Sequence, residues 1–297
     1  MCKYIIGVDA GGTKTVASAY DQNGKRLSTA YGDSGNVSLD FLGSCRAITA
    51  TVSELIHKTI GTPIAICVGC AGIETGNNKT HLRIFLEKEF PYIAVHITND
   101  AELALFAVHG KNNGILIISG TGSIGYSRVN GILSRAGGWG HLIGDDGSGY
   151  RIAMDAIRSI TDGFDTKCPE TPLKAAIFSH LGIKTLPELI SFVYKSSKRD
   201  IAALVPCVCN CADDGDIASQ NILKKAGKDL ANLAITLLPI GNTDIAVATS
   251  GSIITKLFYV KKSFTDTLLE NYKTLKVLSG PFDVPKGAYE MLREVYF

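Results

Sequence analysis

Near its start the chain reads Asp9-Ala10-Gly11-Gly12-Thr13-Lys14-Thr15, a glycine turn between two segments that differ in hydrophobic pattern. Residues 4–9 are almost continuously apolar, whereas residues 15–21 alternate between apolar and polar side chains. A continuous apolar run is typical of a strand buried on both faces, and alternation is typical of a strand buried on one face. The segment is therefore predicted to be the turn of a β-hairpin.

A P-loop also places glycines and a lysine after a strand, but it ends in Gly-Lys-Ser/Thr and opens a helix. This turn ends in Gly12-Thr13-Lys14 and leads into an alternating strand, so a hairpin is the better interpretation. We expect Gly11 and Gly12 to bring backbone N–H groups against phosphate oxygens. We expect Asp9 to hold a Mg²⁺ ion through water, because this ion gives up its hydration shell reluctantly. The alternative is a tight glycine turn beside a surface aspartate.

The same combination of strand, glycine turn and strand returns in the second half of the chain. An apolar run at 114–118 leads into Ser119-Gly120-Thr121-Gly122-Ser123-Ile124-Gly125, which satisfies the dinucleotide pattern G-x-G-x-x-G. That pattern requires a helix next, yet residues 124–129 alternate toward the turn Asn130-Gly131. We therefore expect Gly120 and Gly122 to shape a second hairpin. Two such turns, one in each half of the chain, are predicted to grip a triphosphate from opposite sides.

The order of the predicted elements indicates a duplicated fold. In each half, an Asn-Gly turn (Asn23-Gly24, then Asn130-Gly131) follows the hairpin and leads to a third strand. Periodic apolar residues predict helices over 39–56, 80–90, 148–160, 173–180, 186–194, 201–213 and 217–238, and a further helix that begins at residue 100 or 101. Strands are predicted over 64–70, 93–98 and 244–252. Alternating strands and helices place the chain in the α/β class, as two copies of one unit with a cleft between them.

Composition narrows the range of partners. The 297 residues are 45% hydrophobic and 20% charged, which predicts a soluble protein with a substantial core. Thirty basic and 28 acidic side chains leave a formal charge of +2, so neither nucleic acid nor an anionic membrane is expected as the main partner. No apolar run approaches the roughly 20 residues that span a bilayer. Asp9 interrupts the apolar start that a signal peptide would continue, so we expect a cytoplasmic location.

The chain has eight cysteines. Cys67 and Cys70 lie three residues apart on a predicted strand, which directs their thiols to opposite faces. Cys207, Cys209 and Cys211 lie on a predicted helix, where only the first and the last share a face. We expect ordinary reduced thiols, with a three-ligand zinc or cluster site at the second group as the alternative.

The segment Asn99-Asp100-Ala101 ends one predicted strand and opens an apolar helix. In one interpretation Asp100 is the N-cap of that helix, a role worth about 1 kcal/mol. In the other, its carboxylate lies at the carboxyl end of a sheet strand, where open α/β sheets place their ligands, and accepts a proton from an attacking hydroxyl. The residues alone leave both interpretations open.

A glycine-rich loop spans residues 137–149. Its six glycines stand beside Trp139, His141 and the acidic pair Asp145-Asp146, a composition that no core element has. Such a loop lets the backbone approach a ligand closely, and Asp145 offers a charged acceptor for sugar hydroxyls. We expect His141 to make a structural hydrogen bond, and a role as a base is the alternative.

Taken together, residues 9–15, 119–123 and 137–149 resemble the BadF/BadG/BcrA/BcrD ATPase family, within the superfamily of sugar kinases, hsp70 and actin. The resemblance covers essentially the whole chain, and the branch that it looks most like is that of the N-acetylglucosamine kinases. It implies two duplicated ribonuclease H-like, actin-like ATPase domains with a cleft between them. The first would comprise 1–112 with a C-terminal helix at 285–297, and the second 113–284 with helical insertions.

The resemblance also implies which residues form the site. Asp100 matches the catalytic base and would hold the reactive hydroxyl, and Asp9 matches the position that holds the metal through water. The residues that would surround the sugar are Asn36, Thr121, Gly138 and Asp145. The residues that would contact ATP are Thr13, Lys14 and Thr121 at the phosphates, Gly251 and Ser252 on the adenosine side, and Ala202. Val37 and Gly149 depart from the family pattern, which leaves open the substituents that the sugar carries.

The implied activity is transfer of the γ-phosphoryl group of ATP, with Mg²⁺, to the 6-hydroxyl of N-acetylglucosamine, and N-acetylmuramic acid is a second candidate substrate. Relatives in this family dimerise, so a homodimer is expected. One alternative is an ATP-driven activator of an iron–sulfur reductase or dehydratase, for which Cys207, Cys209 and Cys211 are the candidate cluster ligands. The other alternative is a sugar-sensing regulator without catalysis.

Overall fold

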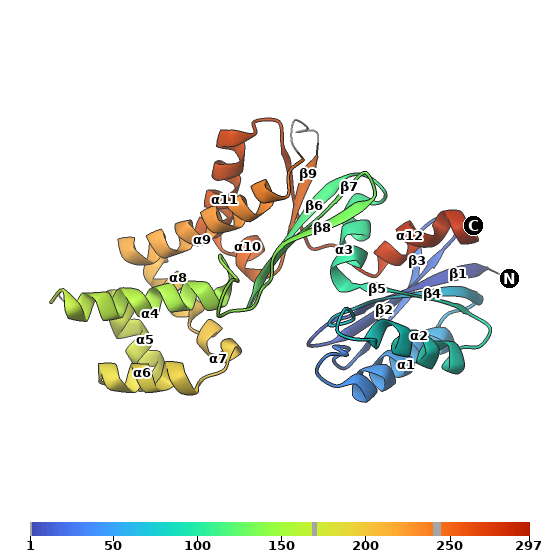
Figure 1. The fold of residues 1–297 in the computed structure, drawn as a ribbon, viewed down its shortest axis with the longest axis horizontal. Coiled ribbons are helices and arrows are strands. Elements are labelled where there is room, and N and C mark those ends of the chain that lie inside the picture. The colour runs from blue at the N-terminus through green and yellow to red at the C-terminus, as the bar shows by residue number, and fades with distance from the viewer. Residues whose placement is uncertain (1, 168–170, 240–244) are drawn as a thin grey trace. The chain divides into compact units, whose positions relative to one another are not determined.

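The computed structural model describes residues 2–167, 171–239 and 245–297. The chain divides into two compact units, which we call unit 1 (Met1–Asn113 with Pro281–Phe297) and unit 2 (Gly114–Gly280). Each unit is a five-stranded mixed sheet with helices packed against it (Figure 1). The prediction of an α/β protein is therefore confirmed.

Unit 1 combines three parallel strands with an antiparallel pair. Its strands are β1 (Lys3–Ala10), β2 (Thr15–Asp21), β3 (Arg26–Gly32), β4 (Thr62–Cys70) and β5 (Ala94–Asn99), and its helices are α1 (Phe41–Lys58), α2 (Asn78–Glu89), α3 (Asp100–His109) and α12 (Lys286–Tyr296). The order across the sheet is β3-β2-β1-β4-β5, with β1, β4 and β5 parallel. The predicted hairpin joins β1 to β2 in antiparallel pairing.

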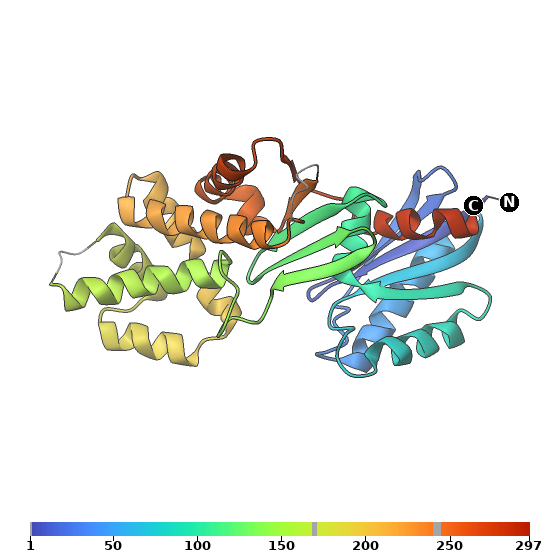
Figure 2. The same cartoon turned by 45° about the horizontal axis from the view of Figure 1, so that its top comes forward.

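Strand β1 is buried on both faces, which explains its continuous apolar run. Tyr4, Ile6, Val8 and Ala10 belong to a core formed with α1 and α2, whereas Ile5 belongs to a second core formed with α3 and α12. This division follows from the two-residue period of a strand. Figures 1 and 2 show α12, in red, on the opposite face of this sheet from α1 and α2. The central strand of unit 1 is thus held between two layers of helices.

The C-terminal helix α12 completes unit 1 by packing against β1. A Cβ added at Gly7 would lie 1.9 Å from the carbonyl oxygen of Pro285, so the strand and the start of the helix meet backbone to backbone. On the second strand, the Tyr20 hydroxyl donates a hydrogen bond to Asp283 Oδ1 at 2.8 Å. The end of the chain therefore stabilises the sheet formed by its beginning.

Unit 2 repeats the strand arrangement of unit 1. Its strands are β6 (Gly114–Ser119), β7 (Ser123–Val129), β8 (Ile132–Gly137), β9 (Ala246–Ser250) and β10 (Lys276–Ser279). Its helices are α4 (Gly149–Asp165), α5 (Pro172–Leu181), α6 (Leu186–Lys195), α7 (Lys198–Ala202), α8 (Val205–Asp213), α9 (Ile217–Thr236), α10 (Ser252–Lys256) and α11 (Phe258–Asn271). The order β10-β9-β6-β7-β8, with β6, β9 and β10 parallel, matches that of unit 1 strand for strand, which confirms the predicted duplication.

The elements of unit 2 differ from the prediction in two segments. The single helix expected over 201–213 is wrong, because α7 ends at Ala202 and α8 begins at Val205 with Pro206 in its first turn. Proline lacks the N–H that a continuing helix needs and favours the start of a new one. The strand expected over 244–252 is β9, and Asp244 lies outside the described residues. The elements α10, α11 and β10 were not predicted.

None of the helices in the described ranges is by itself long and apolar enough to cross a membrane. The bent pair α5 and α6, with 61° between them, meets the length and composition only when both helices are counted together.

The contact between Gly7 and Pro285 predicts the effect of Gly7→Ala. The added Cβ would also lie 2.9 Å from the Cβ of Ala288, so α12 must move away from the sheet. We expect the free energy of unfolding to fall by about 1–3 kcal/mol, the usual effect of overpacking, in urea denaturation followed by circular dichroism.

The matched control is Gly163→Ala in α4, where an added Cβ meets nothing within 4 Å. Alanine favours a helix over glycine by about 1 kcal/mol, so this variant should be as stable as the wild type or more so. Equal unfolding free energies for Gly7→Ala and the wild type would contradict the close packing of α12 on β1.

Candidate functional site

Three parallel strands of unit 1 end at the same edge of its sheet. Ala10 of β1 lies opposite Cys70 of β4, and Cys70 lies opposite Asn99 of β5. Asp9 directly precedes the first of these positions and Asp100 directly follows the last, and both side chains are half-buried. The two aspartates therefore lie at the carboxyl edge of the sheet, where open α/β sheets bind their ligands.

The two aspartates are close enough for their charges to interact. Burial and the charge of Asp100 raise the pKa of Asp9 to about 6, and the charge of Lys14 opposes that shift. Burial also raises the pKa of Asp100, while backbone hydrogen bonds at the start of α3 lower it and the charge of Glu74 raises it. A carboxylate with a raised pKa accepts a proton near neutral pH more readily than an ordinary aspartate does.

The interpretation of Asp100 as a helix N-cap is wrong. Asn99 is the N-cap of α3, and its side-chain oxygen accepts a hydrogen bond from the Glu102 N–H at 2.6 Å. Asp100 is the first residue of the helix, and its Oδ1 accepts a hydrogen bond from the Ala101 N–H at 3.0 Å. Capping therefore does not account for the carboxylate of Asp100.

Glu74 is a further acidic residue at this edge, and no sequence pattern singled it out. It lies in the turn after β4, and its Oε1 accepts a hydrogen bond from Asn99 Nδ2 at 3.0 Å. The same Asn99 side chain thus caps α3 and holds Glu74. The signal that could have found Glu74 is its place after a parallel strand, because such turns lead to the ligand-binding edge.

In the first hairpin, the two glycines have different roles. The Gly11 N–H donates to the carbonyl oxygen of Lys14 at 3.0 Å, so it closes the turn and is not available to a ligand, contrary to expectation. The carbonyl oxygen of Gly11 accepts a hydrogen bond from the Gly35 N–H at 2.9 Å. Among the described residues, the N–H groups of Gly12 and Thr13 have no hydrogen-bond partner. These two exposed amides can meet the oxygens of a ligand.

Asn36 lies beside this hairpin. Its Oδ1 accepts hydrogen bonds from the Ser38 N–H at 3.0 Å and the Ser38 hydroxyl at 2.7 Å, and its Nδ2 is 4.0 Å from a Cβ built at Gly12. The next residue, Val37, is 3% exposed and lies in the core. The Val37 side chain therefore packs inside unit 1.

The second hairpin repeats the hydrogen bonding of the first. The Gly120 N–H donates to the carbonyl oxygen of Gly122 at 2.9 Å, so again the first glycine closes the turn. The carbonyl oxygen of Gly120 accepts a hydrogen bond from the Gly149 N–H at 2.8 Å, which ties the hairpin to the end of the glycine-rich loop. The amides of Thr121 and Gly122 have no hydrogen-bond partner in the part of the chain that the structure describes.

Asp145 is buried beneath the second hairpin. Its side chain is 4% exposed, and its backbone has the left-handed φ of +62°, which is uncommon for a residue other than glycine. Its Oδ1 accepts a hydrogen bond from the Ser123 N–H at 3.2 Å, and its Oδ2 binds the Lys198 ammonium at 2.6 Å. Both oxygens thus have protein partners, and sequence reasoning missed Lys198 because 53 residues separate the pair.

Two predicted glycines are required by the space around them. Gly251 has a φ of +91°, and a Cβ there would lie 2.3 Å from the carbonyl oxygen of Ser119. The turn that leads to Ser252, the first residue of α10, therefore lies against the second hairpin. Gly138 has a φ of +69°, and a Cβ there would lie 2.3 Å from Ile124 Cδ1. Only glycine fits either position without a rearrangement.

The aromatic residues of the glycine-rich loop make ring contacts. His141 meets Tyr150 edge-on, with the ring centroids 4.9 Å apart. The hydrogen bond expected of His141 is not found among the described residues. The Arg135 guanidinium lies 4.0 Å from the ring centroid of Trp139, whose side chain is otherwise 61% exposed.

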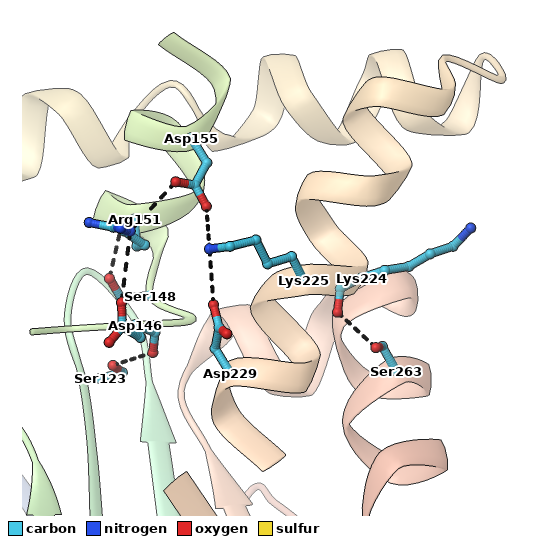
Figure 3. Close-up of polar contacts among 9 residues, drawn as sticks. All are labelled: Ser123, Asp146, Ser148, Arg151, Asp155, Lys224, Lys225, Asp229 and Ser263. Carbon is cyan, nitrogen blue, oxygen red and sulfur yellow. Dashed lines mark hydrogen bonds and ion pairs between the residues drawn. The ribbon is translucent and has the colours of Figure 1, made fainter. Parts of the chain in front are cut away.

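Ion pairs connect the glycine-rich loop to α4 and α9 (Figure 3). Arg151 Nε lies 3.8 Å from Asp146 Oδ1 and 3.5 Å from Asp155 Oδ1. Lys225 Nζ then joins Asp155, at 2.8 Å, to Asp229, at 3.2 Å. Ion pairs that are partly accessible to water add little stability individually. Together these pairs link Asp146, at the end of the loop, to α4 and through it to α9.

The cysteines are arranged as predicted. Cys70 belongs to the core on one face of the first sheet and Cys67 to the core on the other face. On α8, Cys207 and Cys211 are buried, whereas Cys209 is half-buried. Within the described ranges, no group of three His, Cys, Asp or Glu residues could hold a metal ion. Cys207 and Cys211 thus share the buried face of α8, as predicted.

The predicted site residues fall into one cluster in each unit. The members in unit 1 are Asp9, Gly11, Gly12, Thr13, Lys14, Asn36 and Asp100. The members in unit 2 are Gly120, Thr121, Gly122, Asp145, Gly251 and Ser252. Gly138 directly follows β8, and Ala202 lies on α7, half-buried against the core.

The raised pKa of Asp9 predicts a stability that depends on pH. The folded state holds the Asp9 proton up to a pH of about 6, so wild-type stability falls as the pH rises from the ordinary aspartate value to about 6. Asp9→Asn removes this pH-dependent loss of stability, because asparagine does not ionise. We expect the variant to be more stable than the wild type by about 1–2 kcal/mol near pH 7, with contact to water allowed for, and equal to it near pH 4.

The measurement is urea denaturation of both proteins near pH 4 and near pH 7 without divalent metal. A variant that is less stable than the wild type near pH 7, or a difference that does not change with pH, would contradict this assignment.

Comparison with known proteins identifies the family of the chain. The BadF/BadG/BcrA/BcrD ATPase family matches residues 6–283. An N-acetylmuramic acid/N-acetylglucosamine kinase from Clostridium acetobutylicum is 32% identical over 304 residues, with 98% of each chain covered. An N-acetyl-D-glucosamine kinase from Dictyostelium discoideum is 30% identical over 306 residues, with 95% of each chain covered.

Solved structures share the fold. A Chromobacterium violaceum protein provisionally assigned as an N-acetylglucosamine kinase has a TM-score of 0.74 at 24% identity, covering 98% of this chain and 99% of its own. A ROK family glucokinase from Streptomyces griseus, solved with glucose and AMPPNP, has a TM-score of 0.58 at 20% identity, covering 98% of this chain and 99% of its own. With a family match across nearly its whole length, the chain belongs to the BadF/BadG/BcrA/BcrD ATPase family.

Proposed function

We propose that the protein is an ATP-dependent amino-sugar kinase that phosphorylates the 6-hydroxyl of N-acetylglucosamine. The observation that carries the proposal is Asp100: a carboxylate with a raised pKa, at the ligand-binding edge of a sheet, that capping does not explain. Support for the substrate class comes from two relatives of at least 30% identity whose names state kinase activity on N-acetylglucosamine.

In the proposed reaction, the Asp100 carboxylate accepts the proton of the sugar hydroxyl. The hydroxyl oxygen forms a bond to the γ-phosphorus of ATP as the bond between that phosphorus and the β–γ bridging oxygen breaks, and ADP leaves. Phosphoryl transfer depends mainly on positioning and on neutralising charge, because the transferred group is loosely bonded in the transition state. Asp100 then carries the proton until solvent or product removes it.

Backbone amides and one lysine supply the positive potential for the phosphates. In unit 1 these are the N–H groups of Gly12 and Thr13 and the side chain of Lys14. In unit 2 they are the N–H groups of Thr121 and Gly122. Amides fixed in a turn need no reorganisation when charge develops on the phosphoryl oxygens. We assign Gly251 and Ser252 to the adenosine side and Ala202 to a further nucleotide contact.

The chemistry of Asp9 fits a Mg²⁺ ion. A carboxylate oxygen is a ligand that Mg²⁺ prefers, and a bound cation would stabilise the ionised form of a group whose pKa burial has raised to about 6. Asp9 would hold the ion through water, and the ion would neutralise phosphate charge. On the sugar side we assign Asn36, Thr121, Gly138 and Asp145. Each Asp145 oxygen keeps a second lone pair beside its bond to Ser123 or Lys198.

Asp100→Asn tests the proposed base. The amide cannot accept the hydroxyl proton, so we expect kcat to fall by about 10²–10⁴-fold while the Kd for AMPPNP stays within about twofold of the wild-type value. A coupled assay of ADP release and calorimetry measure the two quantities. Asp165→Asn, an exposed carboxylate at the end of α4, is the control and should leave both unchanged. Near wild-type turnover by Asp100→Asn would remove it from this role.

The range of sugars is a separate prediction. We expect turnover of both N-acetylglucosamine and N-acetylmuramic acid, because the relative that shares 32% of its residues with this chain is named for both. The ratio of kcat/KM for the two sugars measures the preference. Absence of turnover with the muramic sugar would restrict the substrate to the smaller one and leave the kinase chemistry intact.

A further inference from the structure

Lys198 is held in a defined position at the second hairpin. It is the first residue of α7, and the residue before it, Ser197, caps that helix. Asp200 closes the cap by accepting hydrogen bonds from the Ser197 N–H at 3.0 Å and the Ser197 hydroxyl at 2.6 Å. Because the backbone is fixed in this way, the Lys198 side chain starts from a constant point and reaches Asp145 Oδ2 at 2.6 Å.

The Lys198 ammonium lies directly against Gly122. A Cβ added at Gly122 would lie 2.6 Å from Lys198 Nζ, and 3.1 and 3.2 Å from the two carboxylate oxygens of Asp145. Gly122 does not have the left-handed backbone conformation that favours glycine. Its lack of a side chain is therefore explained by the space that the ammonium and the carboxylate occupy.

The ammonium has hydrogen-bonding capacity that the protein does not use. A lysine ammonium has three N–H donors, and Asp145 is the acceptor that Lys198 bonds among the described residues. The Lys198 side chain is 30% exposed, whereas that of Asp145 is 4% exposed. The ammonium therefore binds a buried carboxylate, keeps N–H donors that the described residues do not use, and belongs to a side chain that is partly open to solvent.

A buried ion pair is by itself weak support for a role in stability, since the loss of hydration opposes the attraction between the charges. Its position here indicates a different role. The free amides of Thr121 and Gly122 and the Lys198 ammonium lie at the same turn. A combination of free amides with a lysine suits phosphate oxygens.

We propose that Lys198 binds the β- and γ-phosphates of ATP, and that Asp145 positions its ammonium over the second hairpin. This inference rests on the proposed kinase function and adds a binding residue to it. Lys198 supplies unit 2 with a full positive charge at the phosphates, where the amides of the hairpin supply only partial charges.

The test is calorimetric binding of AMPPNP and of AMP, without sugar, to the wild type and to Lys198→Met. We expect the Kd of AMPPNP to rise by at least about tenfold, because a charge-assisted contact is lost. The Kd of AMP, which lacks the β- and γ-phosphates, should stay within about twofold. Lys228→Met, at an exposed lysine of α9, is the matched control and should bind both ligands as the wild type does.

A double variant separates binding from folding. The single variant Lys198→Met leaves the Asp145 carboxylate buried without its partner. The double variant, which also carries Asp145→Asn, removes that unpaired charge. If Lys198 binds phosphate, the double variant still binds AMPPNP weakly. Recovery of wild-type affinity in the double variant would show that Lys198 only neutralises Asp145, and would overturn the proposal.

Measurements on the wild type distinguish a failure of the Lys198 proposal from a failure of the proposed function. If the wild type binds AMPPNP and phosphorylates the sugar, and Lys198→Met binds AMPPNP equally well, the inference about Lys198 is wrong and the kinase function stands. If the wild type neither binds AMPPNP nor phosphorylates an amino sugar, the proposed function fails, and the inference fails with it.

Discussion

Two carboxylates, Asp9 and Asp100, share the carboxyl edge of one sheet, and their repulsion and burial are the constraint on which the site depends. Asp9 cannot move away because it belongs to β1, which is packed between two layers of helices. Asp100 is fixed because Asn99 caps α3 one residue before it. Burial and the charge of Asp100 raise the pKa of Asp9, whereas burial and the charge of Glu74 raise the pKa of Asp100.

The duplicated unit uses the same backbone with different side chains. Both hairpins close through the N–H of their first glycine and leave the next two amides without a partner in the described ranges. The edge of the first sheet carries the pair of aspartates, whereas the second hairpin lies over the ion pair of Asp145 with Lys198. One copy is therefore suited to accept a proton and hold a cation, and the other to hold anionic oxygens.

The hydrophobic period and the turn residues predicted most of the local structure. Strands β1 to β9, both hairpins, the glycine-rich loop and the opposite faces of Cys67 and Cys70 follow from the period of two or from turn chemistry. For Asp100 the residues left two interpretations open, and the N-cap interpretation is wrong because the neighbouring Asn99 caps α3. Lys198 was missed because no local pattern encodes its contact with a carboxylate 53 residues away.

The most direct measurement of the central claim is the titration of the two carboxyl carbons by ¹³C NMR, with Asp9 and Asp100 assigned from the spectra of their asparagine variants. The account predicts that Asp9 titrates near a pH of about 6 and that Asp100 titrates above the ordinary aspartate range. If both carboxyl groups titrate at the ordinary value of about 4, burial and repulsion do not shape this edge of the sheet, and the account is contradicted.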